Sequence, residues 1–569
     1  MRKLTKIISG FLGCLFSVTA FAACDRSLGG DPIRADQTQL TIGVFDGGLG
    51  SEWIYAVKKD FEAKYADVSF EEGKKGVQLR PVPSRSFTQT GMENNIESFK
   101  EDVIFAEGAN AQYFAARGNF LDISDVVKKP LNYDFVRDKD ISEGEKVTIE
   151  SKLSETQKEY FSSVGGKYYA LPTAETYYCI VYDIELFEAK NLYFRPDGNF
   201  IGSVTDERSS GPDGKSETTY DNGLPVSYEQ FFKLCEKIAG LNTESEKYIP
   251  VMWGGSVQEY VSSFLLALAA DYAGVEQTEL NYNYNGMMTK HIESFTATGE
   301  PIVSEQPVSI TAQNGYLLYK QPGRYYALKF LEQLTSKEAY YNHLNATSGG
   351  FTHKDAQGQF IMAKYRKNMQ RAAMLIDGNW WQSEAKGVFN DLVAEKGEEA
   401  SAKNRKFGIM PLPKFDGKAA DYTLLQNTGY IGFINSKVPE NKKMLAKAFL
   451  QYCYTDEALK TYTATTNICR PVRYDMGERY SELGSWGKIM VDLHQNAKFA
   501  YQDSPSKIMQ NYSTDLWYSP RLWMSVVDGE THTYPSKAMI DKKVSAQKYF
   551  EGLSAYWTES VWKNKFQNV

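Results

Sequence analysis

The stretch that decides the fold spans residues 40–61 and reads LTIGVFDGGLGSEWIYAVKKDF. Its first six residues are mostly apolar, a pattern typical of a short buried strand. The glycine-rich residues 46–51 then turn the chain, and Ser51 is placed to cap a helix. Apolar side chains follow at helical spacing, at positions 53, 54, 57 and 61. The stretch therefore predicts a strand, a turn and a helix in succession.

Further apolar stretches extend this pattern into a sheet. Residues 79–82 and 102–106 each predict a strand, and the second strand breaks at Glu107 and Gly108. Strand, helix and strand in this order indicate an α/β lobe whose strands run parallel. Ligands of such sheets bind at the carboxyl ends of the strands, so side chains that follow a strand become candidate site residues.

The length and composition of the chain limit its architecture and its partners. With 569 residues it exceeds what one hydrophobic core usually supports, so we expect more than one lobe. The formal net charge of −7 argues against nucleic acid as a partner, because phosphate binding requires a basic patch. The 38 Tyr and 9 Trp exceed what core packing alone requires, and such residues also suit stacking on sugar rings or contacts with proteins.

The first residues predict an export signal with a lipid attachment site. A positive start at 2–6 precedes an apolar run at 7–21, which is short for a membrane span of about 20 residues. The small residues before Cys24 resemble a bacterial lipobox, whose cysteine becomes the first residue and carries the lipid. We expect 1–23 to be a lipoprotein signal peptide and 24–37 a tether. An ordinary signal peptide followed by a chance cysteine is the alternative.

The rest of the chain contains a few further predicted elements and two segments without a regular pattern. Ser227 and Gln230 form a capping-box pattern at the start of a helix over 227–238. Residues 195–225 are rich in Gly, Ser, Asp and Pro and predict a surface excursion, whereas no element is predicted for 281–312. The remaining expectations are an extended segment over 168–183, a buried strand over 372–376, and a helix whose apolar face holds residues 445, 448, 449 and 452.

The cysteines do not indicate a disulfide scaffold. Cys179, Cys235, Cys453 and Cys469 are too few for one in a chain of this length, and we expect free buried thiols. An exported protein still permits a bridge between Cys453 and Cys469, because export places the chain in an oxidising environment.

No catalytic or metal motif is recognisable. The five histidines form no HExxH or other close ligand pair, and there is no GxSxG motif. Asp213, Glu217 and Asp221 offer oxygen atoms to a calcium ion, but a polar turn is favoured, since a hard cation requires six or more oxygens. We therefore predict no cofactor and no metal, while the many carboxylates leave a glycosidase pair open.

Several segments, in their order along the chain, carry a resemblance to a known family. The earlier ones are YALP at 169–172, VYDIELF at 181–187 and AAMLIDGNW at 372–380. The later ones are GIMPLP at 408–413, GYIGFI at 429–434, KMLAKAFL at 443–450, TDEAL at 455–459 and RPV at 470–472. In order and spacing they resemble the maltose-binding-protein-like family 1 extracellular solute-binding proteins of ABC transporters.

The resemblance implies a two-lobed α/β fold of the periplasmic-binding-protein type, in which hinge-connected lobes close on a solute in the cleft between them. It places an N-terminal lobe at 38–173 and 428–470, and a C-terminal lobe at 174–427 and 471–569. The chain departs from a typical member mainly through the additional residues 195–225 and 281–312, which leave the shape of the pocket open.

Candidate ligand-binding residues follow predicted strands of the first lobe. Glu52 and Trp53 come after the first strand, and Glu107 ends the strand at 102–106. The structural alternatives are a helix start with a core tryptophan and a simple loop charge. Arg470 is a further candidate as a donor to hydroxyl groups, with pairing to a carboxylate as the alternative.

The second lobe offers aromatic candidates. Asp377, Trp380 and Trp381 follow a buried strand, and one of the two tryptophans is expected to pack inward because adjacent side chains diverge. Tyr177 lies in the first crossover, where packing between the lobes is the alternative, and Trp253 lies at a strand end.

Together with the absence of a catalytic motif, the resemblance implies a non-enzymatic receptor. We expect a monomeric, lipid-anchored protein on the outer side of the cell membrane that binds a carbohydrate, preferably an oligosaccharide, and delivers it to the permease subunits of an ABC importer. Aromatic and carboxylate side chains outnumber cationic ones in the expected loops, which favours sugars over anions. The alternatives are a surface glycoside hydrolase and a surface sensor or adhesin with the same fold.

Overall fold

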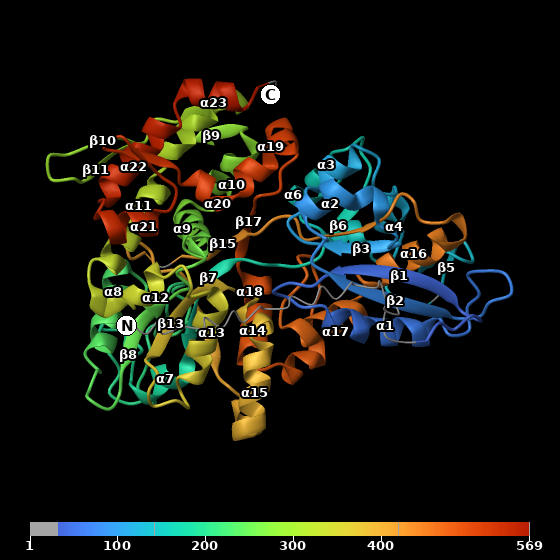
Figure 1. Cartoon of the computed structure of the whole chain (residues 1–569), viewed down its shortest axis with the longest axis horizontal. Helices are drawn as coiled ribbons and strands as arrows, with labels where there is room; N and C mark the ends of the chain where they lie inside the picture. Colours follow the sequence, from blue (N-terminus) through green and yellow to red (C-terminus); the bar gives the residue numbers. More distant parts are fainter. Residues whose placement is uncertain (1–31, 142, 419, 568–569) are drawn as a thin grey trace, which may run out of the picture.

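A computed structural model describes residues 32–141, 143–418 and 420–567. Within these ranges the chain forms two α/β lobes that lie side by side (Figure 1). The predicted signal peptide, the lipidation site Cys24 and residues 24–31 of the predicted tether lie outside the described residues. None of the described helices is both long and apolar enough to span a bilayer.

The N-lobe is built on a sheet with strand order β2-β1-β3-β16-β6. Strands β1 (Thr38–Phe45), β2 (Val77–Ser84) and β3 (Val103–Ala106) run parallel, as the sequence predicts. Strand β16 (Ile431–Ile434) returns from late in the chain and runs antiparallel to β3 and to β6 (Ala170–Pro172).

Helices cover this sheet because each presents an apolar stripe to it. On α1 (Glu52–Lys64) the predicted positions Trp53, Ile54, Val57 and Phe61 are all buried. The other helices and strands of this lobe are α2 (Gln89–Asn95), α3 (Ala111–Ala115), α4 (Ser124–Lys128), β4 (Tyr133–Asp134), β5 (Lys139–Asp140), α5 (Ile149–Lys152), α6 (Glu155–Phe161), α16 (Glu440–Tyr452) and α17 (Asp456–Thr466).

The C-lobe is built on a sheet with strand order β14-β7-β13-β8. Strand β13 (Arg371–Gly378) runs parallel to β8 (Tyr248–Met252) and antiparallel to β7 (Tyr178–Asp183), which also pairs with β14 (Phe407–Met410). The helices of this lobe are α7 (Ile184–Ala189), α8 (Tyr228–Ala239), α9 (Gln258–Ala273), α10 (Val275–Asn283), α11 (Pro322–Thr335), α12 (His343–Thr347), α13 (His353–Met362), α14 (Trp381–Glu384), α15 (Lys386–Lys396), α18 (Ser485–Asn496), α19 (Lys507–Trp517), α20 (Ser519–Leu522), α21 (Pro535–Lys542), α22 (Ala546–Tyr556) and α23 (Glu559–Lys565).

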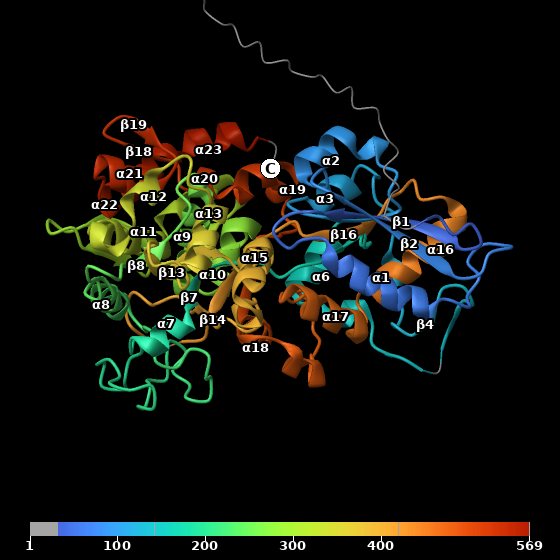
Figure 2. The ribbon, with the colours of Figure 1, turned by 60° about the horizontal axis from the view of Figure 1, so that its bottom comes forward.

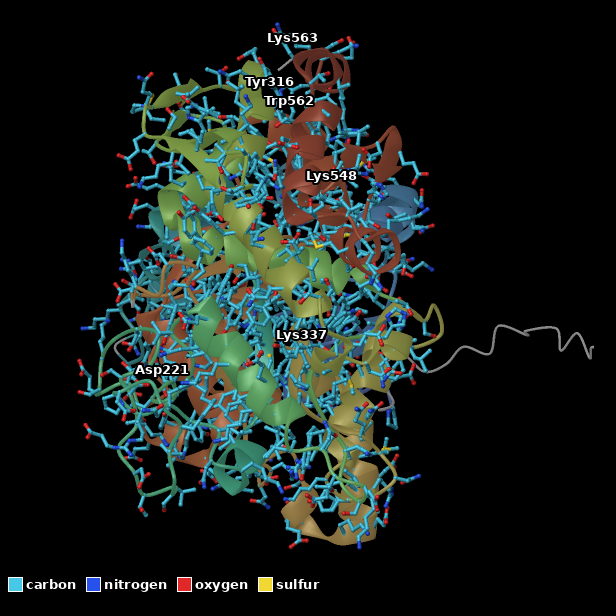
Figure 3. The ribbon with its side chains drawn as sticks, turned by 90° about the vertical axis from the view of Figure 1, so that its left-hand side faces the viewer. Asp221, Tyr316, Lys337, Lys548, Trp562 and Lys563 are labelled. Carbon is cyan, nitrogen blue, oxygen red and sulfur yellow. The ribbon has the colours of Figure 1, made fainter. Side chains whose placement is uncertain are left out.

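The segment 281–312, for which no element is predicted, forms short antiparallel strand pairs. Strand β9 (Gly286–Met288) pairs with β12 (Val308–Ile310), and β10 (His291–Phe295) pairs with β11 (Pro301–Ser304). Trp562 of the C-terminal helices packs on this segment and donates to the Ala312 carbonyl at 2.7 Å, and Figure 3 shows it beside Tyr316. The pairing depends on these distant helices, which explains why local periodicity does not reveal it.

Additional strands join segments far apart in the sequence. Strand β15 (Thr423–Gln426) pairs in parallel with β17 (Lys498–Tyr501), and β18 (Ser525–Val527) forms a hairpin with β19 (Glu530–His532). The β15–β17 pair carries the chain from the C-lobe to the hinge on one side and toward α19 on the other.

The predicted helix caps are correct in position and differ in their bonds. Ser51 precedes α1, but its hydroxyl donates to Asp46 at 3.0 Å and makes no cap bond. Ser227 caps α8 by accepting from the Gln230 amide, whereas the Gln230 side chain accepts from the amide of Val226 instead of completing a capping box.

The lobes are joined where crossing segments run side by side. The extended segment predicted over 168–183 splits between β6 and β7, and residues 173–177 cross between the lobes. The amide of Thr173 donates to Tyr430 and that of Glu175 to Cys469, both at 2.9 Å. Glu175 also pairs with His494 of α18 at 2.7 Å. The hinge therefore consists of crossing segments that are hydrogen-bonded to one another. The lobe boundaries expected from the sequence stay predictions.

Two further predictions concern the cysteines and the surface segment 195–225. Among the described residues Cys179, Cys235, Cys453 and Cys469 are free and buried, as predicted, and Cys453 forms no bridge. Residues 195–225 contain turns, but Asp221 inside them is buried and accepts from the Tyr422 hydroxyl. Figure 3, which views the molecule from the left-hand side of Figure 1, labels Asp221 in the C-lobe. No metal-holding group of His, Cys, Asp or Glu is found within the described ranges.

Candidate functional site

A cavity of about 520 Å³ lies between the lobes. On the N-lobe side it begins where strands end: β1 ends at Phe45, Arg85 follows β2 and Glu107 follows β3. The carboxyl ends of parallel strands meet at one edge of a sheet, which is why these residues, distant in sequence, share one wall. The hinge adds the residues Asn427, Thr428 and Tyr430.

The C-lobe side of the cavity is aromatic. The ring of Trp380 stands nearly perpendicular to Tyr178, with centroids 5.2 Å apart, and to Tyr260, with centroids 6.1 Å apart. Edge-to-face packing of this kind fixes ring orientation. The other residues on this side are Glu259, Ser263, Leu266, Ala267, His353, Lys354, Glu384, Leu425, Gln502, Trp517, Tyr518 and Ser519.

Two glycines allow the tryptophan to take its place. A Cβ atom on Gly378 would lie 2.2 Å from the Trp380 ring, so the indole folds directly over that backbone. A Cβ atom on Gly48 would lie 2.6 Å from Cδ1 of the same indole. The glycine-rich loop after β1 therefore lets the N-lobe backbone come into contact with the C-lobe ring.

A polar network lies behind the aromatic wall. His353 Nε2 lies 3.2 Å from Glu384 Oε1, and the Gln357 amide donates to both Glu384 and Asp377 at 3.0 Å. Burial opposes the charge on His353, but the hydrogen bond and charge of Glu384 prevail and raise the pKa of the imidazole. Burial alone would raise the pKa of Glu384, yet His353 keeps it below its ordinary value. Each member of the pair therefore favours the charged form of the other.

Other carboxyl groups near the cavity are held closer to neutrality. Burial raises the pKa of Glu107 to about 7, against the hydrogen bond from Tyr430 and with the charge of Glu384 adding to the rise. Burial likewise raises the pKa of Asp377 to about 7, opposed by its bonds from Gln357 and from the Gly378 amide. The site thus combines an ion pair with carboxyl groups that carry a proton part of the time.

The structure brings some of the predicted site residues together. Glu107 and Trp380 line the cavity from opposite lobes, and Asp377 is buried directly behind it, joined to the wall through Gln357. Of the adjacent tryptophans, Trp380 reaches the cavity, whereas Trp381 is fully buried against Phe360, Phe407 and Trp486. Contact of Glu107, Asp377 and Trp380 with a ligand stays a prediction.

Other predicted residues of the N-lobe side lie away from this cavity. Glu52 pairs with Lys386 of the C-lobe at 2.9 Å, beside a smaller interlobe pocket of about 260 Å³ that Trp53 also borders. Arg470 is buried with its guanidinium 4.9 Å from the Trp53 ring and 4.5 Å from that of Tyr462. The helical stripe of α1 faces the sheet, which turns Trp53 inward and encloses Arg470 with it.

Tyr177 and Trp253 are also core residues. Tyr177 is fully buried, and its hydroxyl lies 3.5 Å from the Met490 sulfur. Strand alternation sends the next side chain, Tyr178, to the cavity instead. Trp253 stacks on Tyr341 with ring centroids 5.3 Å apart and borders no part of the cavity. A strand end marks the correct edge of the sheet but does not decide which way a ring turns.

The sequence missed much of the C-lobe wall. Glu259, Tyr260 and Ser263 lie on one face of α9, and their helical spacing is a signal that could have grouped them. His353 and Glu384 come from different helices, α13 and α14, and Trp517 and Tyr518 come from more than 130 residues further along the chain. No local pattern joins these residues.

Chemically, the cavity suits a ligand with both apolar faces and many hydroxyl groups. Aromatic rings can cover the C–H faces of a ring, while carboxylates, amides and tyrosine hydroxyls can bond paired hydroxyls. The lining is partly apolar, with a few polar groups, as small-molecule sites usually are.

The comparisons with known proteins agree with this geometry. The family model described as bacterial extracellular solute-binding protein matches residues 66–488. No curated protein matches the sequence. Solved structures match at low identity, and their likeness concerns the fold alone. A chitin oligosaccharide binding protein is 16% identical (TM-score 0.53; 93% of this chain and 99% of that chain covered).

Two further solved structures are similar over almost their whole length. One is the GacH receptor of Streptomyces glaucescens, solved unliganded and with acarbose (13% identity, TM-score 0.53; 94% of this chain and 99% of that chain covered). The other is maltose-bound MalE3 of T. maritima (13% identity, TM-score 0.52; 91% and 99% covered). The matched family covers most of the chain, and the lobed architecture with its interlobe cavity agrees with it, so this protein belongs to the bacterial extracellular solute-binding proteins.

Proposed function

We propose that this protein is the lipid-anchored solute-binding component of an ABC importer and that it captures a carbohydrate, preferably an oligosaccharide, between its lobes for delivery to the permease. The protein acts as a monomer on the outer side of the cell membrane and performs no chemistry on its ligand. Cys24 carries the lipid, and the residues after it act as the tether.

The observation that carries the proposal is the pairing of an aromatic wall with polar groups in a cavity between the lobes. Trp380, Tyr178 and Tyr260 present ring faces and edges, and Glu107 stands on the opposite lobe. A site for phosphate or sulfate would require uncompensated cations. Here His353 and Lys354 both approach Glu384, at 3.2 and 3.9 Å, so that carboxylate offsets part of their charge, and Arg85 is the remaining basic residue of the lining.

The similar structures support the same ligand class. The chitin oligosaccharide binding protein, the GacH receptor solved with acarbose and the maltose-bound MalE3 each share the fold of this chain. The cavity volume of about 520 Å³ lies within the range of small-molecule sites and leaves room for more than a single small solute.

A thermal-shift screen of the full chain against mono- and oligosaccharides tests the proposal. A sugar that binds only the folded state raises the melting temperature in proportion to the logarithm of its concentration over Kd. We expect oligosaccharides to raise it and inorganic phosphate or short peptides to leave it unchanged. A shift with a peptide and none with any sugar would refute the carbohydrate assignment.

The anchor requires a separate test. Metabolic labelling with an alkyne fatty acid should mark the wild-type chain, and Cys24→Ser should abolish the label and release the protein from the membrane fraction. Persistence of both label and membrane association in that variant would contradict the assignment of Cys24.

A hydrolytic activity is the second candidate, and one observation favours it. Glu107 and Glu384 face the same cavity, and their environments move their pKa values apart, upward for Glu107 and downward for Glu384. Pairs of that kind serve as general acid and base in glycosidases. Product analysis after incubation with each sugar found in the screen decides the matter, because a pure receptor returns its ligand intact.

A further inference from the structure

Two glutamates of the cavity lining have no cation beside them. Glu107 follows β3 of the N-lobe, and Glu259 lies in the first turn of α9 in the C-lobe. Figures 1 and 2 both show α9 in one lobe and β1, the strand that pairs with β3, in the other. Neither carboxylate forms an ion pair with a described lysine, arginine or histidine. The cavity therefore has an uncompensated carboxylate on each wall.

Hydroxyl groups are the partners that these glutamates do have. Tyr430 donates to Glu107, and Tyr518 and Tyr534 donate to Glu259 at 3.2 and 2.8 Å. A hydroxyl stabilises a carboxylate but does not cancel its charge. Both glutamates are half-buried, where a charge without a counter-charge is costly. Each carboxylate is therefore stabilised further if a ligand brings a positive charge to it.

The basic residues of the lining do not supply that charge. His353 and Lys354 lie beside Glu384, and the Lys354 side chain is 54% exposed. Arg85 is exposed and forms no ion pair with the described residues. An exposed cation is solvated by water, so it requires a partner less than a half-buried carboxylate does. The interior of the cavity is therefore short of positive charge.

The hydroxyl of Tyr178 lies where the charges of both walls act together. Burial raises the pKa of Tyr178, against a hydrogen bond from Ser263. The charges of Asp377, Glu107 and Glu259 raise this pKa further. Negative charges around a phenol oppose its ionisation and attract a cation to the same place.

The aromatic wall next to this hydroxyl is also open to a cation. The rings of Tyr178, Tyr260 and Trp380 pack edge to face on one another. No described lysine or arginine stands over these three rings, whereas Arg521 lies 5.8 Å from the centroid of the Tyr518 ring. Ring faces attract cations most strongly where water is excluded. A cation in the cavity thus meets carboxylates and ring faces that have no cationic partner within the described protein.

We propose that the carbohydrate bound between the lobes is an amino-sugar oligosaccharide whose protonated amino group lies between Glu107 and Glu259, beside the Tyr178 hydroxyl. A primary ammonium group has three N–H donors and no acceptor, which matches two carboxylates and a phenol oxygen. Asn427 and Gln502 of the lining remain for the hydroxyl groups of the sugar. This inference rests on the proposed function and narrows its ligand to one charge class.

Paired sugars that differ in charge test the proposal. Glucosamine and galactosamine oligomers carry the ammonium group, and their N-acetylated forms of equal length carry a neutral amide in its place. Calorimetric titration of the full chain should give, in one of the two series, a Kd about tenfold lower for the ammonium form, because hydrogen bonds to charged groups are the stronger ones. Neutral glucose and galactose oligomers and the polyamine spermidine complete the panel.

Variants locate the ammonium group in the cavity. Glu107→Gln keeps the shape of the side chain and removes its charge, so the Kd values of the ammonium and N-acetylated forms should come within about twofold of each other. Glu259→Gln on the opposite wall should also reduce the preference, and it serves if Glu107→Gln does not fold. The control Glu72→Gln removes the same charge from an exposed position of the N-lobe outside the cavity and should keep the full preference.

The outcomes distinguish this inference from the proposed function. Equal or weaker binding of the ammonium forms by the wild type overturns the amino-sugar assignment and leaves carbohydrate binding standing. A full preference in both cavity variants also overturns the inference, because the two glutamates then do not hold the amino group. Binding of spermidine without binding of any sugar overturns both proposals. If no amino sugar binds, the inference is overturned, and the thermal-shift screen with neutral sugars still decides the proposed function.

Discussion

The N-lobe reaches the cavity with loops at strand ends, which present the backbone of Gly47, Gly48 and Gly108 together with the Glu107 carboxyl. The C-lobe reaches it with rings, which come from β7, α9 and the residues after β13. The N-lobe wall is thus rich in glycine backbone, and the C-lobe wall joins aromatic surface, held by edge-to-face contacts, with most of the charged residues of the lining.

The difference indicates that the two lobes contribute to ligand binding in different ways. Aromatic platforms contribute by burying apolar area and require fixed orientation, which the packed C-lobe helices and sheet supply. A lobe that closes on a platform requires close approach, which glycine permits because it has no Cβ atom. We therefore expect substitutions on the aromatic wall to remove ligand contact and substitutions on the glycine wall to prevent closure.

The largest effect is expected for Trp380→Ala. Loss of a central indole at an interface typically costs about 2 kcal/mol or more, so the Kd for the preferred sugar should rise about thirtyfold. Calorimetric titration measures the change. Tyr55→Ala, which removes an exposed ring of α1 outside the cavity, is the control and should bind as wild type. Equal binding by wild type and Trp380→Ala would remove the aromatic wall from the site.

The glycine wall is tested by Gly48→Val. A Cβ atom at this position meets the Trp380 ring at 2.6 Å, so the lobes must stay slightly apart. We expect about a tenfold loss of sugar affinity with little change in melting temperature. Gly349→Val introduces the same side chain at a C-lobe glycine with open space around it, and it should have no effect on binding. Full affinity in Gly48→Val would show that close approach of this loop is not required.

The buried carboxyl group of Asp377, behind the aromatic wall, is expected to make the stability of the protein depend on pH. Burial raises the pKa of Asp377 to about 7, so the folded state holds this proton more tightly than the unfolded chain does. Stability from this group is therefore greatest at low pH, declines as pH rises from about 4 to 7, and stays low above that. Asparagine does not titrate, so Asp377→Asn should become more stable relative to wild type as pH rises. The difference in free energy of unfolding between variant and wild type, measured by urea unfolding, should be on the order of 1 kcal/mol larger at pH 8 than at pH 5. An identical difference at both pH values would contradict the assignment.

The smallest effect is expected for Tyr177→Phe. The hydroxyl of Tyr177 contacts the Met490 sulfur and the Asn379 side chain deep in the C-lobe, and the ring does not reach the cavity. Sugar affinity should stay within about twofold of wild type, because removing a remote hydroxyl changes no ligand contact. A marked loss in this variant, combined with normal stability, would mean that the wall extends behind Tyr178.

Features that depend on neighbouring residues were predictable from the sequence, and features that depend on tertiary packing were not. The strand, turn and helix of residues 40–61 and the parallel order of β1 to β3 were predictable, because apolar periodicity acts locally. Glu107 and Trp380 were placed at the cavity edge by the rule that sites lie at strand ends. Trp53, Trp253 and Trp381 satisfied the same rule and are buried in the cores, since the rule locates an edge and says nothing of the packing around each side chain. Tyr177, chosen for its place in the crossover, and Arg470, chosen as a donor to hydroxyls, are buried as well.

The sequence by itself determined the alternation of strands and helices, the glycine loops after the strands, and the order of segments that marks the family. These are properties of neighbouring residues and of their spacing along the chain. Only the tertiary structure decided which rings face the cavity, how 281–312 pairs, and that Asn110 and Gln112 bond to a segment some 400 residues away. Such contacts depend on how two lobes and a late helix pack together, and no local pattern carries that information.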